Sequence, residues 1–171
     1  SEDKTISVPV PSFTLIGATT EIGSLATPFI DRFKNKHTLK LYSNEDLKAI
    51  AQSNVSKLQI SLSENAMDLV ATISKGTPRI VNSTLEWLRD YKIAGRLGQL
   101  SEEDVEKAMK IRGIDANGLT DVDRQYLRAL NNSDIPLGIS TISATIGIDR
   151  ATIEDTIEPW LLRNHIILKT P

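Results

Sequence analysis

The stretch FTLIGATTEIGSLATPFIDRF, residues 13–33, decides how the first part of the chain is interpreted. It begins with the apolar run 13–16, typical of a buried β-strand, and two hydroxyls, Thr19 and Thr20, follow where such a strand ends. A loop containing glycine leads to Pro28, and Arg32 then lies next to an aromatic side chain. Because open α/β sheets present polar groups to ligands at the carboxyl ends of their strands, this pattern predicts a strand, a loop and a short helix beside a ligand. An ordinary α/β domain without such a ligand fits the same pattern.

Four motifs that follow one another along the chain resemble the RuvB family, the AAA+ ring ATPases that drive branch migration of Holliday junctions. They are FTLIGATT with the later P-x-x-D-R-F segment, KGTPRI at residues 75–80, GLTDVDR at 118–124 and TIEDTIEP at 152–159. The resemblance covers nearly the whole chain. It implies a mainly α fold with three parts: a remnant of an AAA+ α/β domain at 1–42, a helical lid at 43–112 and a winged helix at 117–171.

The composition excludes several other classes of protein. Hydrophobic residues make up 40% of the 171 and charged residues 25%, with a net charge of −2, as in ordinary globular proteins. The absence of cysteine excludes disulfides and thiolate metal sites, and two distant histidines do not suggest zinc, so no metal site is predicted. No apolar run reaches the roughly 18 residues of a membrane span, and no signal peptide is visible. A cytoplasmic protein without a membrane segment is therefore expected.

The phosphate-binding motif G-x-x-x-x-G-K-[ST] is missing from these residues. With the resemblance, ATP and Mg²⁺ are expected as cofactors of a longer parent protein. This chain alone is expected to bind neither and to be inactive as an ATPase.

The resemblance assigns a role in ATP hydrolysis to five residues. Arg32 corresponds to an arginine finger that acts on a neighbouring subunit's nucleotide, and Thr20 to the first sensor of the γ-phosphate. Arg79 corresponds to the second sensor, with Thr77 and Pro78 beside it at the nucleotide. Arginine suits both positions because its planar guanidinium stays charged and binds phosphate oxygens with two hydrogen bonds.

Each assignment has a plainer alternative. The threonine hydroxyls could bond nearby backbone, Arg32 could pair with Asp31 or Glu21, and Arg79 could pair with a neighbouring acid. A cation in the first turn of a helix is unfavourable, because it lies beside the positive end of the helix dipole. An anion bound next to Arg79 would explain why an arginine stands there. The chain also departs from the family at two positions, where Glu21 and Ile30 stand in place of arginines.

Polar caps and apolar spacing predict the helices of the lid and of the winged helix. We expect helices to begin after Ser43, Ser63, Thr77 and Ser101, and near Asp121, Ser140 and Asp149. A short linker is expected at 113–118. Strands are expected at 36–41 and 166–168, and residues 1–11 read as a hairpin strand that is disordered or paired with another molecule.

The charge of residues 117–171 argues against sequence-specific reading of DNA. Five Lys or Arg stand against seven Asp or Glu, and the third helix of this part carries Glu154, Asp155 and Glu158 together with Pro159. Acids facing a major groove would repel phosphates. Lys169 and Arg150 remain as candidate DNA contacts to the backbone.

The resemblance implies a subunit of a homohexameric ring motor that acts on Holliday junction DNA in recombination and repair. Its partners would be a RuvA-type junction-binding protein and a RuvC-type resolvase in the bacterial cytoplasm. Two alternatives are a DNA-binding or regulatory module without ATPase function and a pure interaction scaffold. The ordered sensors and finger favour the motor, since a regulator has no use for all three.

Overall fold

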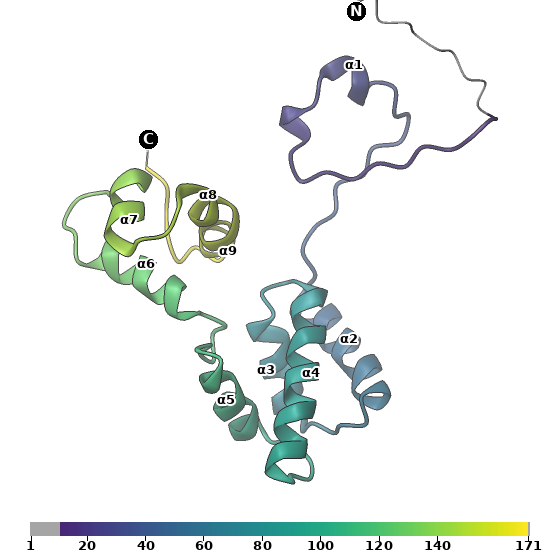
Figure 1. The fold of residues 1–171 in the computed structure, drawn as a ribbon, viewed down its shortest axis with the longest axis vertical. Helices are drawn as coiled ribbons and strands as arrows, with labels where there is room; N and C mark the ends of the chain where they lie inside the picture. Colours follow the sequence, from purple (N-terminus) through teal and green to yellow (C-terminus); the bar gives the residue numbers. More distant parts are fainter. Residues whose placement is uncertain (1–10, 171) are drawn as a thin grey trace, which may run out of the picture. The chain divides into compact units, whose positions relative to one another are not determined.

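The computed structural model describes residues 11–170, which divide into two units at residue 39. In the first unit, η1 (Ile22–Ser24) and α1 (Thr27–Ile30) are single short turns (Figure 1). The rings of Phe29 and Phe33 meet edge to face with centroids 5.3 Å apart, and this pair anchors the turn that carries Arg32. The hairpin strand predicted at 1–11 lies almost wholly outside the described residues.

The strands predicted at 13–16, 36–41 and 166–168 are not formed. Within the described part of the chain, the sole β-pairing is an isolated bridge between Leu62 and Leu100. Phe13 and Ile16 are 72% and 88% exposed, although their pattern is that of a buried strand. A strand needs a neighbour to satisfy its backbone groups, and residues 11–39 supply none.

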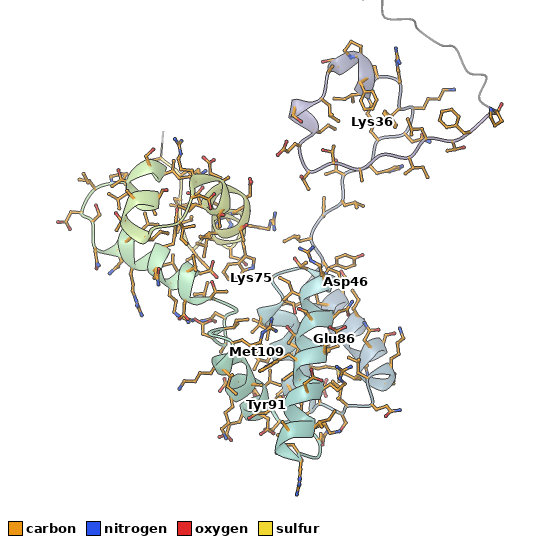
Figure 2. The ribbon with its side chains drawn as sticks, viewed as in Figure 1. Lys36, Asp46, Lys75, Glu86, Tyr91 and Met109 are labelled. Carbon is orange, nitrogen blue, oxygen red and sulfur yellow. The ribbon has the colours of Figure 1, made fainter. Side chains whose placement is uncertain are left out.

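The lid consists of four helices: α2 (Asn44–Lys57), α3 (Glu64–Ile73), α4 (Pro78–Gly95) and α5 (Glu102–Ile111). Ser43, Ser63 and Ser101 cap α2, α3 and α5 with their hydroxyls, as predicted. Each of these helices turns its apolar face inward, and Met109, labelled in Figure 2, belongs to the shared core. The Trp87 indole donates to the carbonyl of Ala108 at 3.0 Å and thereby ties α4 to α5.

The start of α4 only partly matches its predicted cap. Helix α3 ends at Ile73 with Ser74 as its C-cap, and Lys75 and Gly76 follow in left-handed backbone conformations. Thr77 has the N-cap position of α4 with Pro78 next to it, but its hydroxyl makes no capping bond.

The third part of the chain is built from α6 (Asp121–Asn131), α7 (Ile139–Ile146), α8 (Arg150–Thr152), η2 (Ile153–Ile157) and α9 (Glu158–Arg163). Their apolar side chains form a separate core: Tyr126, Ile142, Ile153, Ile157, Leu161 and Ile167. The predicted helix after Asp149 is present but contains the π-helical turn η2 just before Pro159. Because proline cannot donate a hydrogen bond, the regular ladder must be interrupted near this position. The mainly α fold class is confirmed.

Candidate functional site

Thr19 and Thr20 lie in an exposed segment without regular structure. The Thr19 hydroxyl accepts a hydrogen bond from the backbone N–H of Glu21 at 3.0 Å, which is the plain backbone role considered for it. Thr20 makes no side-chain hydrogen bond within residues 11–170 and is exposed. Its hydroxyl is therefore available for another partner, whereas that of Thr19 is already used.

Arg32 comes just after Asp31, the C-cap of α1, and carries an exposed guanidinium. Its backbone N–H donates to the Phe29 carbonyl at 3.3 Å, so the backbone is fixed while the side chain is not. Asp31 pairs with Lys36 at 3.3 Å instead of with Arg32. Among residues 11–170 no acid pairs with Arg32, which removes the plain alternative of a surface ion pair with Asp31 or Glu21.

Thr77, Pro78 and Arg79 lie together at the start of α4, an 18-residue helix. Pro78 occupies the first helical position, where its missing N–H costs nothing. Arg79 is exposed and forms no ion pair with any described residue. A guanidinium beside the unpaired N–H groups of a helix N-terminus is an arrangement that favours an anion such as a phosphate.

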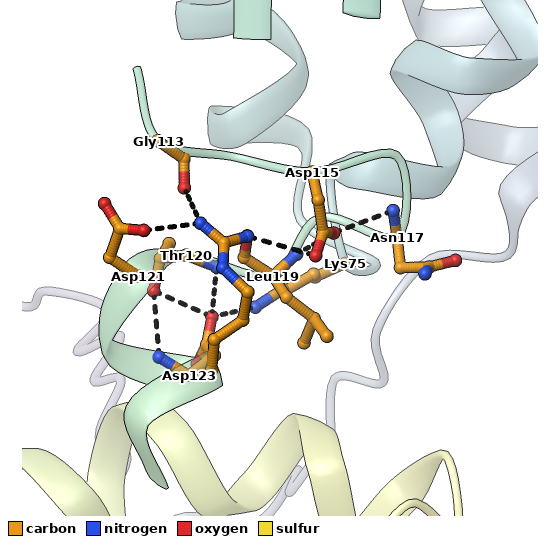
Figure 3. Close-up of polar contacts among 9 residues, drawn as sticks. Lys75, Gly113, Asp115, Asn117, Leu119, Thr120, Asp121 and Asp123 are labelled. Atoms are coloured by element: carbon orange, nitrogen blue, oxygen red, sulfur yellow. Dashed lines mark hydrogen bonds and ion pairs between the residues drawn. The ribbon is translucent and has the colours of Figure 1, made fainter. Parts of the chain in front are cut away.

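The loop between α3 and α4 is joined to the winged helix by Lys75. Its ammonium donates to Asp123 at 2.8 Å (Figure 3). The same ammonium lies 4.6 Å from the centre of the Trp160 ring. Asp123 also accepts from the backbone N–H and hydroxyl of Thr120 at 2.8 and 2.9 Å. Burial favours the neutral form of Asp123, but the bonds from Lys75 and Thr120 outweigh it, so its pKa is lowered. The sequence reading missed this contact because nothing local links positions 75 and 123.

Arg124 fixes the segment predicted as a linker. Its guanidinium donates to Asp115 at 3.0 Å, to Asp121 at 2.6 Å and to the carbonyls of Leu119 and Gly113 at 2.7 and 2.8 Å (Figure 3). Its pKa is raised, first through the bond to Asp121. The junction is therefore held by one side chain at four points, and it is not a loose tether.

The acids of the last helical segment do not all face outward. Glu158 was counted among the acids that would repel a DNA groove, but it is 5% exposed and accepts from the Tyr126 hydroxyl at 2.8 Å. Lys169, a candidate DNA contact, lies with its ammonium 2.7 Å from the other Glu158 oxygen. The pKa of Lys169 is raised, mainly by this bond.

Three arginines of the winged helix are exposed and form no ion pair with a described residue: Arg128, Arg150 and Arg163. Arg150 was a candidate from the sequence, and the other two were not. Arg128 and Arg163 could have been identified only by knowing which other basic side chains are paired with acids. Those ion pairs are tertiary contacts, which the sequence does not show.

Metal-binding clusters and membrane-spanning helices are both absent from residues 11–170. No group of three or more histidine, aspartate or glutamate side chains is placed to hold a metal ion. No helix there is long and apolar enough to cross a membrane.

Comparisons with known proteins point to one family. Residues 42–115 match the model of the RuvB AAA lid domain, and residues 116–171 match that of the RuvB C-terminal winged helix domain. A curated RuvB subunit of the Holliday junction branch migration complex from Kosmotoga olearia is 38% identical over 98% of this chain and 49% of its own length. The corresponding subunit of Parasynechococcus marenigrum is 38% identical over 100% of this chain and 50% of its own.

Among solved structures, the Thermotoga maritima RuvB branch migration motor superposes with a TM-score of 0.78 at 28% identity. The superposition covers 87% of this chain and 51% of the Thermotoga maritima chain. The chain thus spans about half the length of the relatives that it matches.

Proposed function

This chain belongs to the RuvB family and corresponds to its C-terminal portion, and from that premise we propose that it forms part of an ATP-dependent Holliday junction branch-migration motor. In this proposal residues 1–42 carry the first sensor and the finger, residues 43–112 are the lid with the second sensor, and residues 117–171 face DNA. The motor is a homohexameric ring in the bacterial cytoplasm. It works with a RuvA-type junction-binding protein and a RuvC-type resolvase.

The observation that carries the proposal is the state of the two arginines. Arg32 and Arg79 are both exposed, and neither is bound by an acid within residues 11–170. Guanidinium groups without a local partner are what a phosphate-handling site requires. A purely structural role would have been supported by ion pairs that satisfy them.

Each candidate residue then has a distinct task. Arg32 reaches across a subunit boundary and binds the oxygens of the phosphoryl group that is being transferred, where an arginine finger contributes roughly 10³ to 10⁵ in rate. Arg79 binds nucleotide phosphates from the lid, with Thr77 and Pro78 setting the start of its helix. Thr20 orients the attacking water with its free hydroxyl. Glu21 and Ile30 add no positive charge, so Arg32 acts alone in its segment.

ATP and Mg²⁺ fit these residues only in part. The arginines suit the phosphates, while the described residues offer no carboxylate cluster for Mg²⁺ and the chain has no phosphate-binding glycine loop. Bound ATP supplies the phosphoryl group whose hydrolysis drives the motor, and Mg²⁺ neutralises its charge. Both are held by the nucleotide-binding half of the complete motor.

DNA contact is proposed for the winged helix through the phosphate backbone. Arg150 is exposed and unpaired among the described residues, whereas the charge of Lys169 is already shared with Glu158. Arg150 is therefore the stronger of the two candidates, and Lys169 would have to exchange Glu158 for a phosphate.

The finger is tested in the complete motor with Arg32→Ala, and with Lys34→Ala as a nearby exposed control. We expect Arg32→Ala to reduce ATP turnover by about 10³-fold or more while nucleotide binding is unchanged. Subunits with this change, mixed with subunits defective in the phosphate-binding loop, should regain part of the activity. Turnover that survives Arg32→Ala, or mixed rings without rescue, would contradict a finger that acts in trans.

A second test addresses the isolated chain. Titration of these 171 residues with ATP in a calorimeter should give no measurable binding, because the phosphate cradle is absent from them. Tight binding by the isolated chain would contradict the division of labour proposed here.

A further inference from the structure

We propose that Lys75 is a positioning residue: by binding Asp123 and Trp160 of the winged helix it holds the loop that leads into Arg79. The orientation of the winged helix is thereby coupled to the phosphate-facing arginine. The inference rests on the proposed role of Arg79, and the experiment below separates the two.

The first support is the enclosure of the Lys75 side chain. Its ammonium lies 2.8 Å from Asp123, and the two side chains are only 17% and 7% exposed. Trp160 of α9 covers the same ammonium at 4.6 Å from its ring centre. An ion pair and a cation–π contact shielded from water are stronger than their surface counterparts. By contrast, the side chains of the Lys107–Glu103 pair on α5 are 59% and 74% exposed.

The second support is the backbone of the loop. Lys75 and Gly76 both adopt left-handed conformations, with φ of 51° and 76°. A residue with a side chain adopts this conformation at a steric cost that glycine does not bear. On the other side of the loop, the Tyr42 N–H donates to the Gly76 carbonyl at 3.0 Å, and a Cβ on Gly76 would lie 2.8 Å from Leu41. The loop is thus confined on one side by residues 41–42 and on the other by the winged helix.

The third support is the sharing of Asp123. The same carboxylate oxygen that binds Lys75 accepts from the N–H and the hydroxyl of Thr120. The bond from the Thr120 N–H is one half of the capping box of α6, and the bond from the Asp123 N–H to the Thr120 hydroxyl is the other. The winged helix cannot turn away from the lid without stretching either this cap or the bond to Lys75. Arg79 is the second residue of α4 and lies four positions after Lys75, so a displacement of Lys75 moves the start of the helix that carries it.

The structural half of the test uses NMR on this chain. Relaxation of ¹⁵N amides measures the tumbling times of residues 44–111 and 121–163, which should agree in the unsubstituted chain. Lys75→Ala should make the two times diverge and shift the Trp160 indole resonance, which is identified by its loss in Trp160→Phe. Lys75→Arg should preserve both readings, and Lys107→Ala is the matched control that removes an exposed lysine pair. Equal tumbling times in Lys75→Ala would overturn the inference.

The functional half uses ATP hydrolysis by the complete motor. We expect Lys75→Ala to lower kcat/KM for ATP by roughly 5- to 150-fold, the usual range for coupled sites, and Lys75→Arg to restore most of it. In an Arg79→Ala background, Lys75→Ala should have no further effect, because it acts through that arginine. Fully additive losses would overturn the positioning role.

The two proposals fail in different ways. If Arg79→Ala leaves kcat/KM unchanged, the sensor assignment is wrong, and the positioning role falls with it. If Arg79→Ala is strongly impaired but Lys75→Ala behaves like Lys107→Ala, the sensor stands and only the positioning role is wrong.

Discussion

At the scale of single residues, the buried carboxylate of Glu158 is the most consequential feature of the winged helix. It is 5% exposed and is bonded to the Tyr126 hydroxyl and paired with the Lys169 ammonium. A buried charge is tolerated only when its partners are present. Burial, and then the bond to Glu158, raises the pKa of Tyr126, so this hydroxyl remains a donor at neutral pH.

Tyr126→Phe should destabilise the winged helix by about 1 to 3 kcal/mol, because it leaves a buried oxygen of Glu158 without its donor. Urea unfolding at pH 7 measures this loss. Tyr42→Phe is the matched control, since Tyr42 is half exposed and its hydroxyl makes no hydrogen bond with a described residue. An equal effect of the two changes would show that the Tyr126 bond contributes nothing.

The raised pKa of Tyr126 also predicts a pH dependence. A group whose pKa is raised on folding stabilises the native state below its unfolded pKa, about 10 for tyrosine, and this stability is lost as the pH rises through the folded value. The free energy of unfolding should therefore fall above about pH 10. Tyr126→Phe should show a shallower fall over the same range, with Lys169 still contributing in the same direction. Identical slopes would contradict the assignment to Tyr126.

At the scale of elements, the lid helices α2, α3 and α5 begin where their own serine caps place them. Ser101 accepts from the Asp104 N–H at 3.2 Å, and the Asp104 carboxylate accepts from the Ser101 N–H at 2.9 Å. Such a reciprocal pair, which α2 also has, is local in sequence and does not depend on packing, and the same holds for the single Ser63 cap of α3. This is why the starts of α2, α3 and α5 could be predicted from the sequence.

Ser101→Ala removes one half of this cap and should cost about 1 kcal/mol of stability. Chemical unfolding followed by far-UV circular dichroism measures it. Ser56→Ala, near the end of α2, is the control, because its exposed hydroxyl makes only a 3.3 Å bond to the Ser53 carbonyl. A loss at Ser56 as large as that at Ser101 would exclude capping as the cause.

At the scale of the whole second unit, the Lys75 contact and the approach of Gly118 to Ile73 both join the lid to the winged helix. A Cβ on Gly118 would lie 2.8 Å from the Ile73 carbonyl oxygen, and the φ of Gly118 is +78°. Glycine alone satisfies both the close approach and the left-handed backbone.

Gly118→Ala should therefore lower stability by at least about 1 kcal/mol, through strain and through displacement of the winged helix from α3. Differential scanning calorimetry would record it as a lower Tm or as a split transition. Gly98→Ala is the control, because no atom lies within 4 Å of its Cβ position. A Tm for Gly118→Ala equal to that of Gly98→Ala would show that the close approach is unimportant.

The sequence by itself determined the helices of the lid, the serine caps of α2, α3 and α5, the inward faces, and the family to which the chain belongs. Residues such as Ser43, Ser63 and Ser101 act through hydrogen bonds within four positions, so their effect is visible locally. The sequence also identified Arg32 and Arg79 as candidates, since both stand in motifs. Their roles as finger and sensor stay predictions.

Only the tertiary structure decided which of these charges are already used. Lys75 is bound by Asp123, 48 positions away, and Glu158 is enclosed by Tyr126, 32 positions away, so no local pattern could reveal either. The predicted strands failed for the related reason that pairing is non-local, and residues 13–16 have no neighbouring strand among the described residues. Caps and periodicity act along the chain, whereas ion pairs, burial and strand pairing depend on which distant residues meet, and that is set only when the chain has folded.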